Sequence, residues 1–425
     1  MTFEPTLEFA RRCDAEDPLR EYRSAFALPC DKRGEPLLYF AGHSLGLQPL
    51  AARARVTEEL DDWAHLGVLG HESARRPWIH YHENLTAGLQ HIVGARASEV
   101  VAMSSLTVNL HLMMASFYRP SGTRKKILIE AGAFSSDRHA VAAQIEWHGL
   151  DPRSELIELP PRRGEALVPE EAVENLLSRH GHEVALVLWP GVQFRTGQAF
   201  DLDRIVRAGH SVGCMVGFDL AHSVGNVPLS LHDSEADFAA WCSYKYLNGG
   251  PGAIGGCFIH ERHFNSAPLS RLSGWWGHDV ATRFQMSPEF RAMPGAAGWQ
   301  VSNPSILSAA ALLASLEIFG AARMDRIREK SVALTGFLEF LLQPLFESIQ
   351  IVTPRDPSSR GAQLSLRILG APDRGKQIFN WLTERNAISD WRDPDIIRVA
   401  PIPLYTRFEE VYRLAELITT ATRAK

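Results

Sequence analysis

Short apolar runs alternate with helical patterns between about residue 120 and residue 260. The runs KKILIE, SELIEL, VALVLW and CMVGFDL predict strands, and VALVLW is apolar throughout, as expected of a strand covered on both faces. Helical patterns lie between them, at 135–149, at 169–181 and in DLDRIVRAGHSVG. This alternation predicts an α/β fold with a mostly parallel, doubly wound sheet.

The pattern changes after about residue 302. Two long helical stretches come first, then the strand candidates IQIVT and AQLSLRIL, a helix over 373–386, the run IIRVAP and a terminal helix from about 407. The first 50 residues look irregular and suggest an arm packed on the main domain. We therefore expect an N-terminal arm that also contributes to a small domain (1–50), a large domain (51–310) and a smaller α+β C-terminal domain (311–425).

Composition narrows the function classes. The 425 residues carry a formal net charge of −5, with 45% hydrophobic and 22% charged residues, which is typical of globular proteins. No apolar run reaches the roughly 18 residues of a membrane span, and no secretory signal is evident. The mild negative charge disfavours nucleic acid as a partner. Five cysteines without zinc spacing, and histidines without metal-ligand spacing, predict cytoplasmic thiols and no metal.

Two residues that follow the predicted strands carry candidate chemistry, because ligands in such sheets bind at the carboxyl ends of strands. Asp219 ends the run CMVGFD, with His222 shortly after it, and Lys245 lies in the apolar, aromatic and then glycine-rich stretch WCSYKYLNGGPG. Desolvation suits a lysine to covalent chemistry with a carbonyl group. Two plainer interpretations stay open: Asp219 caps a turn, and Lys245 lies along the surface.

The order of these residues matches the needs of pyridoxal phosphate (PLP). Its aldehyde binds a lysine, and its ring nitrogen pairs with a carboxylate. Leu106 and Thr107 open a helix-like run, which suits the phosphate. An aromatic residue and a helix start that could cover the ring follow in Phe134, Ser135, Ser136 and Asp137.

The chain resembles the kynureninase family, which are PLP-dependent hydrolases of fold type I, the aspartate aminotransferase-like group. The resemblance runs from YFAGHSLGLQP (39–49) to RVAPIPLY (398–405), and its most specific motifs are GFDLAHSVGNVPL (217–229) and WCSYKYLNGGPG (241–252). It implies hydrolysis of L-kynurenine to anthranilate and L-alanine, and the choice between L-kynurenine and 3-hydroxy-L-kynurenine, which would give 3-hydroxyanthranilate, stays open. The implied setting is tryptophan catabolism by the kynurenine pathway, or NAD biosynthesis.

The resemblance also implies roles for individual residues. Lys245 would bind the cofactor covalently and move the Cα proton, Asp219 would pair with the ring nitrogen, and Tyr244 would hold the phosphate and deliver a proton to Cβ. Further cofactor contacts would come from Leu106, Thr107, Phe134, Ser135, Ser136, Asp137 and His222.

Other matched residues concern the substrate and a second subunit. Arg398 matches the arginine that pairs with the substrate α-carboxylate through a bidentate fork. His71 and Ser44 match positions near the aryl ring. Trp275 and Asn303 match residues that reach the site from the partner in a homodimer with shared sites, and Asn303 would also contact substrate. Each of these residues also has a plain structural interpretation, such as a turn or an ion pair.

Two departures and two rival functions remain. His43 stands where many members carry Asn, and Pro190 stands where some members offer a serine to the cofactor. A cysteine desulfurase-like lyase would need a nucleophilic cysteine on a loop well after the lysine, but the last cysteine, Cys257, lies in an apolar run. A catalytically silent PLP-fold binding protein is the second rival, although every motif position carries a competent residue.

Overall fold

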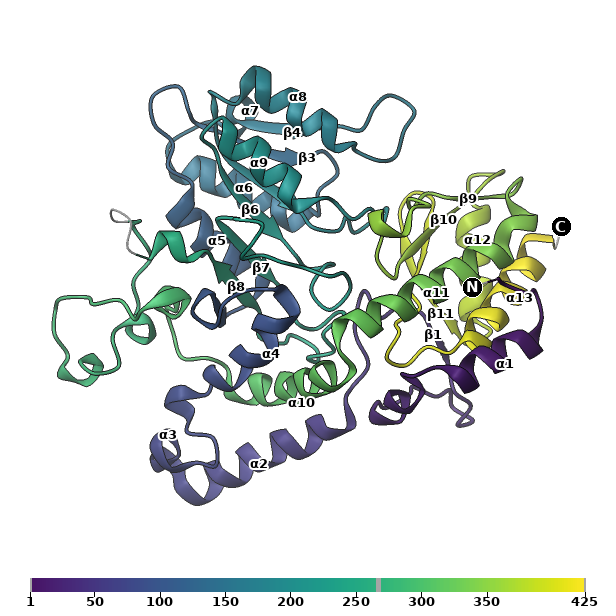
Figure 1. The fold of residues 1–425 in the computed structure, drawn as a ribbon, viewed down its shortest axis with the longest axis horizontal. Helices are drawn as coiled ribbons and strands as arrows, with labels where there is room; N and C mark the ends of the chain where they lie inside the picture. The colour runs from purple at the N-terminus through teal and green to yellow at the C-terminus, as the bar shows by residue number, and fades with distance from the viewer. Residues whose placement is uncertain (1, 265–268, 424–425) are drawn as a thin grey trace.

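The computed structural model describes residues 2–264 and 269–423. Figure 1 shows two bodies: a larger one built around a seven-stranded sheet, and a smaller one that contains both chain ends. Helices α10 (Ile306–Ala322) and α11 (Met324–Leu342) run from the larger body to the smaller one.

The sheet of the larger body has the strand order β2-β8-β7-β6-β5-β3-β4. Strands β4, β3, β5, β6 and β7 are parallel neighbours, and β8 runs antiparallel to β7 and β2. The strands are β2 (Val100–Ala102), β3 (Lys126–Glu130), β4 (Leu156–Leu159), β5 (Val184–Pro190), β6 (Met215–Asp219), β7 (Phe238–Trp241) and β8 (Gly256–Ile259).

Both faces of this sheet are covered. From Leu186 onward, successive residues of β5 alternate between two apolar clusters: Leu186 and Leu188 pack on one side, and Val187 and Trp189 on the other. This confirms the prediction of a doubly wound α/β sheet. The larger body's other helices are α2 (Leu50–Leu66), α3 (Gly70–Ser73), α4 (Glu83–Val93), α5 (Leu106–Phe117), α6 (Ser135–Trp147), α7 (Pro152–Glu155), α8 (Glu170–His180) and α9 (Leu202–Ser211).

The smaller body is an antiparallel sheet of order β12-β13-β10-β9 packed with helices. A short parallel pair joins β1 to β11, so the N-terminal chain is tied to this body. Its elements are α1 (Leu7–Glu16), β1 (Leu38–Tyr39), β9 (Ile349–Ile351), β10 (Leu364–Ile368), α12 (Arg374–Thr383), β11 (Ala387–Ile388), β12 (Asp390–Arg392), β13 (Ile396–Val399) and α13 (Phe408–Arg423).

Residues 1–50 were expected to form an irregular arm that also contributes to a small domain, and the structure shows that this part of the chain contains the helix α1, which packs in the smaller body. The hydroxyl of Thr6 accepts a hydrogen bond from the Phe9 amide and caps the helix. Phe9, Ala10 and Cys13 form its buried face and pack with α11 and α13 of the smaller body. Both signals were present in the sequence, a cap followed by apolar residues one turn apart, but the helix is short and polar elsewhere.

The apolar clusters change over within α11. Ile327 belongs to the cluster of the larger body, whereas Leu334 and Leu338 belong to that of the smaller body. We therefore propose a division between the two bodies inside α11 rather than at residue 310.

Among the described helices, none is by itself long and apolar enough to cross a membrane. Helix α10 passes that test only when it is joined to the chain up to Leu345 across an 82° bend.

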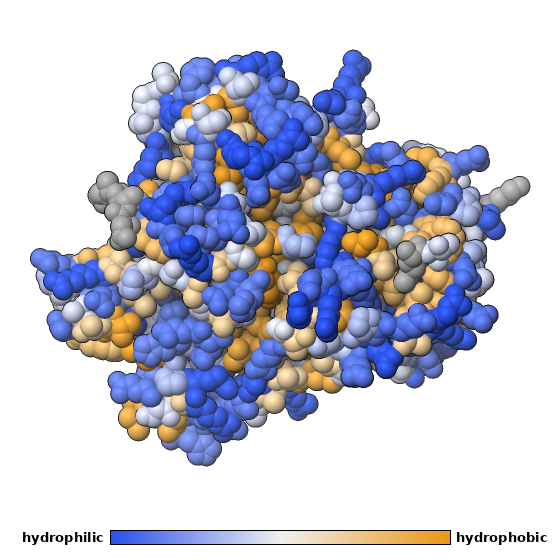
Figure 2. Space-filling view, viewed as in Figure 1, coloured by the Kyte–Doolittle hydropathy of each residue, from blue (hydrophilic) through white to orange (hydrophobic). Residues whose placement is uncertain are grey.

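Residues 269–304, which precede α10, project from the larger body on the left of Figure 1. They contain the short helical turns Trp275–Gly277, Arg283–Gln285 and Gly295–Trp299. Phe284 and Met286 are strongly exposed there, and Figure 2 shows apolar residues among hydrophilic ones on this projection. We call residues 269–304 the projecting segment.

Replacing Phe9 by Ala should loosen α1 from α13, because truncating a buried phenylalanine typically removes about 3 to 5 kcal/mol of stability. Native-state hydrogen exchange of the α1 amides should then become about a hundredfold faster or more. Phe284→Ala, at an exposed ring, is the matched control. Equal exchange rates in the Phe9 variant and the wild type would contradict the packing described.

Candidate active site

The strand ends of the larger body bring Asp219 and Lys245 to one cavity. The register pairs Asp219 with Pro190 of β5 and with Ala240 of β7, and Lys245 follows shortly after β7 ends. The cavity measures about 240 Å³. Its lining includes most of the residues predicted to contact the cofactor, namely Leu106, Thr107, Phe134, Ser136, Asp137, Asp219, His222, Tyr244 and Lys245.

The amine of Lys245 is held between an imidazole and two aromatic rings. Its Nζ lies 3.0 Å from Nε2 of His222, 5.9 Å from the Phe134 ring centre and 5.7 Å from that of Tyr244. Burial, and then the charge of Lys245, hold the pKa of His222 well below its usual value. A neutral His222 with its proton on Nδ1 can therefore accept a hydrogen bond from the Lys245 amine through Nε2.

Two buried carboxyl groups face this amine. Asp219 accepts a hydrogen bond from the Ala221 amide at 2.8 Å. Burial, and then the neighbouring charge of Asp219, raise the pKa of Asp137 well above its usual value. The raised pKa favours a proton on Asp137, since two close carboxylates in a dry site do not both ionise. A buried anion of this kind fits a protonated ring nitrogen.

Two helix starts meet at the other end of the cavity. Neither Ser105 before α5 nor Phe134 before α6 caps its helix through a side chain, so amides of both first turns are left to a ligand. The hydroxyls of Thr107 and Ser136 lie 2.7 Å apart between them. This donor set fits a phosphate group. Ser135, also predicted to contact the cofactor, is exposed and does not line the cavity.

Three further predicted residues, His71, Trp275 and Asn303, lie away from this chain's cavity. His71 is exposed, and its ring packs edge-on against Trp78 at 5.5 Å. Trp275 is 43% exposed on the projecting segment, and Asn303 is exposed near its end. Within one chain, the structure therefore does not bring these three side chains to the lysine.

Arg398 and Ser44 lie beside the cavity and contact each other. Arg398 is buried in β13, and its Nη2 donates to the Ser44 hydroxyl at 3.2 Å. Its Nη1 donates to the carbonyl of Phe194, a residue that lines the cavity. One edge of the Arg398 guanidinium already faces the carboxylate of Asp390.

The two departures are both close to the lysine. Pro190 lines the cavity and offers no side-chain hydrogen bond there. His43 is fully buried, and neither of its ring nitrogens has a hydrogen-bond partner among the described residues. Burial, and then the charges of Arg398 and Lys245, hold the pKa of His43 well below its usual value, so this imidazole is neutral.

The comparisons with known proteins agree with each other. A family model described as the kynureninase C-terminal domain matches residues 327–418. A kynureninase of Myxococcus xanthus (strain DK1622) is 56% identical and covers 98% of this chain and 97% of its own. A kynureninase of Xanthomonas campestris pv. campestris (strain B100) is 53% identical over 99% of both chains. The chain belongs to the kynureninase family.

Solved structures similar to this kynureninase family member share its fold at low identity. One is a C-DES variant with glycine covalently linked to the PLP cofactor, with TM-score 0.76, 19% identity, and coverage of 90% of this chain and 96% of that one. Another is the Escherichia coli cysteine desulfurase CsdA, with TM-score 0.75, 16% identity and 99% coverage of both chains. The fold is that of the PLP-dependent fold-type I enzymes, as predicted.

The two cysteines nearest to Lys245 in the sequence of this kynureninase family member, Cys242 and Cys257, do not suit desulfurase chemistry. Cys257 is fully buried in β8, and burial raises the pKa of its thiol. Cys242, close to the lysine, is also buried, and burial raises its pKa to about 11. Both thiols stay protonated at neutral pH, whereas a nucleophilic cysteine needs an accessible thiolate.

Sequence reasoning missed Glu130, which lines the cavity. It ends β3 just as Asp219 ends β6, so a search for carboxylates at strand ends would have found it. Its carboxyl group is buried and its Oε2 has no partner among the described residues. Burial raises the pKa of Glu130 to about 8, so the group is mostly protonated at neutral pH.

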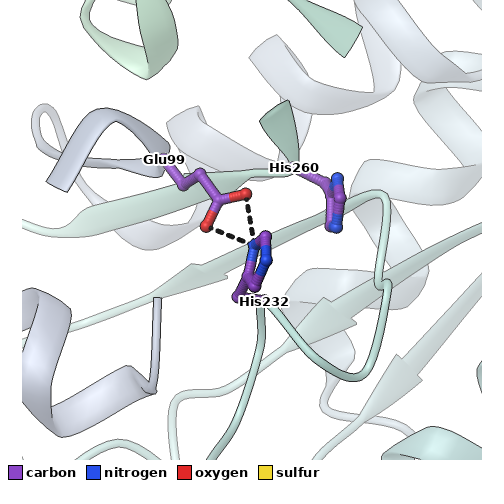
Figure 3. A group of neighbouring side chains, drawn as sticks. All are labelled: Glu99, His232 and His260. Atoms are coloured by element: carbon purple, nitrogen blue, oxygen red, sulfur yellow. Dashed lines mark hydrogen bonds and ion pairs between the residues drawn. The ribbon is translucent and has the colours of Figure 1, made fainter. Parts of the chain in front are cut away.

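Three residues with metal-ligating side chains also meet, although their spacing in the sequence gave no sign of it. Figure 3 shows Glu99, His232 and His260, whose ligand atoms lie within 4.8 Å of one another. Both carboxylate oxygens of Glu99 already accept from backbone amides or from His232. The two imidazole rings are stacked with 12° between their planes, so their lone pairs do not converge. This cluster ties loops together, and we infer no metal site there.

The buried carboxyl group of Glu130 should make stability depend on pH. The folded protein keeps a proton that the unfolded chain releases between about pH 4.5 and pH 8, so this group lowers stability as pH rises through that range. Glu130→Gln should therefore be more stable than the wild type at about pH 9, with a much smaller difference at about pH 5. Urea denaturation at both pH values measures this. The exposed Glu165→Gln is the control, and a pH-independent difference for Glu130→Gln would contradict the assignment.

Proposed function

We propose that this member of the kynureninase family hydrolyses L-kynurenine to anthranilate and L-alanine with pyridoxal phosphate. The observation that carries the proposal is the Lys245 amine, 3.0 Å from a neutral His222, in a cavity that also holds the Asp219 carboxylate and two uncapped helix starts. Curated kynureninases that are 52–56% identical over nearly the full chain support it.

The residues present fit the cofactor at each end. Lys245 would hold the aldehyde carbon, Asp219 the ring nitrogen and Phe134 one ring face. The phosphate would take the amides at the start of α5 together with Thr107, Ser136 and Tyr244. When bound, pyridoxal phosphate supplies an electron sink that stabilises negative charge next to the substrate nitrogen.

The chain's own residues would then handle protons. Lys245 is the base for the Cα proton, since His222 accepts from its amine and keeps it inside the cavity. Tyr244 is our candidate donor to Cβ. Burial raises the pKa of Tyr244, so its hydroxyl stays protonated at neutral pH and can donate. Its ring lies 5.7 Å from the Lys245 amine, close enough for both groups to act on one substrate.

Lys245→Ala should abolish anthranilate formation from L-kynurenine, a loss of more than about 10³-fold in kcat, because the variant lacks both the covalent anchor and the base. Anthranilate fluorescence measures the turnover. The exposed Lys32→Ala is the matched control and should retain wild-type turnover. Undiminished turnover by the Lys245 variant, or a purified wild type without bound cofactor absorbance, would overturn the proposal.

We further propose a homodimer with shared sites. Trp275 and Asn303 are exposed and outside this chain's own cavity, and the projecting segment also exposes Phe284 and Met286. Large exposed apolar side chains gathered on one segment are typical of an interface. We infer that the partner's projecting segment completes each cavity. We also infer that the same residues decide whether 3-hydroxy-L-kynurenine is accepted as a substrate.

Mixing two inactive variants tests the shared site. Lys245→Ala and the double variant Trp275→Ala/Asn303→Ala should each be nearly inactive alone. Random exchange of subunits would make half of the dimers mixed, each with one intact site, so about a quarter of wild-type activity should return. Sedimentation should show a dimer throughout. No recovery despite proven exchange would contradict sharing.

We infer the cellular compartment from the state of the cysteines. All five cysteines are free thiols, and only Cys30 is exposed, which fits the reducing cytoplasm. A kynurenine-cleaving enzyme there would serve tryptophan catabolism or the supply of NAD precursors.

A further inference from the structure

The guanidinium of Arg398 is already engaged along one edge. Asp390 lies opposite Arg398 in the β12–β13 pairing, and its Oδ1 is 2.9 Å from Nε and 2.7 Å from Nη2. Nη1 donates to the Phe194 carbonyl at 2.7 Å, and Nη2 donates to Ser44 at 3.2 Å. Of the five N–H groups of an arginine, this leaves one on Nη1. The bidentate fork expected of Arg398 is therefore largely used within the protein.

A second arginine shares the same carboxylate. Arg392 lies two residues after Asp390 on β12, so both side chains leave the same face of the strand. Nη2 of Arg392 donates to Oδ2 of Asp390 at 3.2 Å, and its Nε lies 2.9 Å from Oδ1. Two guanidinium groups around one carboxylate carry a net charge of +1, which a single further carboxylate would neutralise.

This cluster adjoins the cavity. The Cζ atoms of Arg392 and Arg398 lie 5.9 Å and 6.0 Å from the ring centre of Phe194, which lines the cavity and meets Phe134 edge-on at 5.2 Å. The positive charges of both arginines also act on the buried His222, whose Nε2 contacts Lys245. The excess positive charge therefore lies beside the cavity that holds Lys245.

We propose that Arg392 and Arg398 together recognise the substrate α-carboxylate, and that Asp390 is a positioning residue that orients both guanidinium groups. The proposal rests on the function proposed above. Ser44 belongs to this carboxylate site rather than to the aryl ring, because its hydroxyl donates to Asp390 at 2.7 Å and accepts from Arg398.

Burial explains why the two arginines need Asp390. Removing Arg398 from water, and the nearby charge of Arg392, lower the pKa of Arg398 to about 10, while Asp390 opposes this shift. Without the carboxylate, two guanidinium groups would repel each other at a dry site. Arg392 is 36% exposed along its side chain, so it can turn toward a ligand with little rearrangement of the sheet.

Arg392→Gln separates the two roles of the site. We expect KM for L-kynurenine to rise about tenfold to a hundredfold, as for loss of a charge-assisted hydrogen bond, with kcat within about threefold. Kynurenamine, which lacks the carboxylate, should inhibit the variant and the wild type with Ki values within about threefold of each other. Arg367→Gln is the matched control and should leave KM unchanged. Arg367 lies on the neighbouring strand β10 and pairs with Asp395.

Asp390→Asn, alone and combined with Arg392→Gln, tests whether Asp390 orients the guanidinium groups or only balances their charge. The single variant should raise KM by about tenfold or more. The double variant Asp390→Asn/Arg392→Gln restores the net charge of +1 but not the orientation, so KM should stay high. Recovery of wild-type KM in the double variant would overturn the positioning role of Asp390.

The remaining outcomes are equally decisive. An unchanged KM in Arg392→Gln, or equal losses for L-kynurenine and kynurenamine, would overturn the role of Arg392. Failure of the wild type to cleave L-kynurenine would instead refute the proposed function itself, because that measurement involves no change at Arg392 or Asp390.

Discussion

A charged carboxylate buried at the end of β6 constrains the whole site. The Ala221 amide donates to Asp219, and burial, followed by the neighbouring charge of Asp219, raises the pKa of Asp137 well above its usual value. The cavity must then supply positive charge, which Lys245 provides and a protonated ring nitrogen would add to. The parallel register of β5, β6 and β7 sets these groups side by side, so the chemistry depends on the sheet.

The same electrostatic logic recurs at the junction of the two bodies. There Asp390 is shared by two arginines, which leaves positive charge next to a cavity whose other end offers amides to a phosphate. A ligand with one carboxylate near its reacting carbon would be oriented by the smaller body, while the cofactor would be held by the larger one. Solved structures 16–19% identical to this chain share the fold, so the fold alone does not determine the chemistry.

Local signals explain which parts of the structure could be predicted. The strands β5 and β6 and the helix α8 could be predicted because apolar runs and capping residues are local patterns. The end of a predicted strand also identified Asp219. Glu130 obeyed the same rule and was overlooked, and α1 was too short to stand out. The sharing of Asp390 by Arg392 and Arg398 depends on antiparallel register, and the Glu99–His232–His260 cluster depends on loops far apart in sequence. No local pattern carries such information. The role proposed for Trp275 and Asn303 depends on the partner subunit of the proposed homodimer, which no pattern within one chain specifies.

The role of the Asp219 carboxylate is tested most directly by Asp219→Asn. The variant and the wild type should be compared for bound pyridoxal phosphate per chain and for kcat with L-kynurenine. We expect the variant to retain cofactor through Lys245 and the phosphate contacts, but to lose about 10²-fold or more in kcat, because its ring nitrogen is no longer held protonated. A variant that binds cofactor and turns over L-kynurenine at the wild-type rate would contradict the central role of this buried charge.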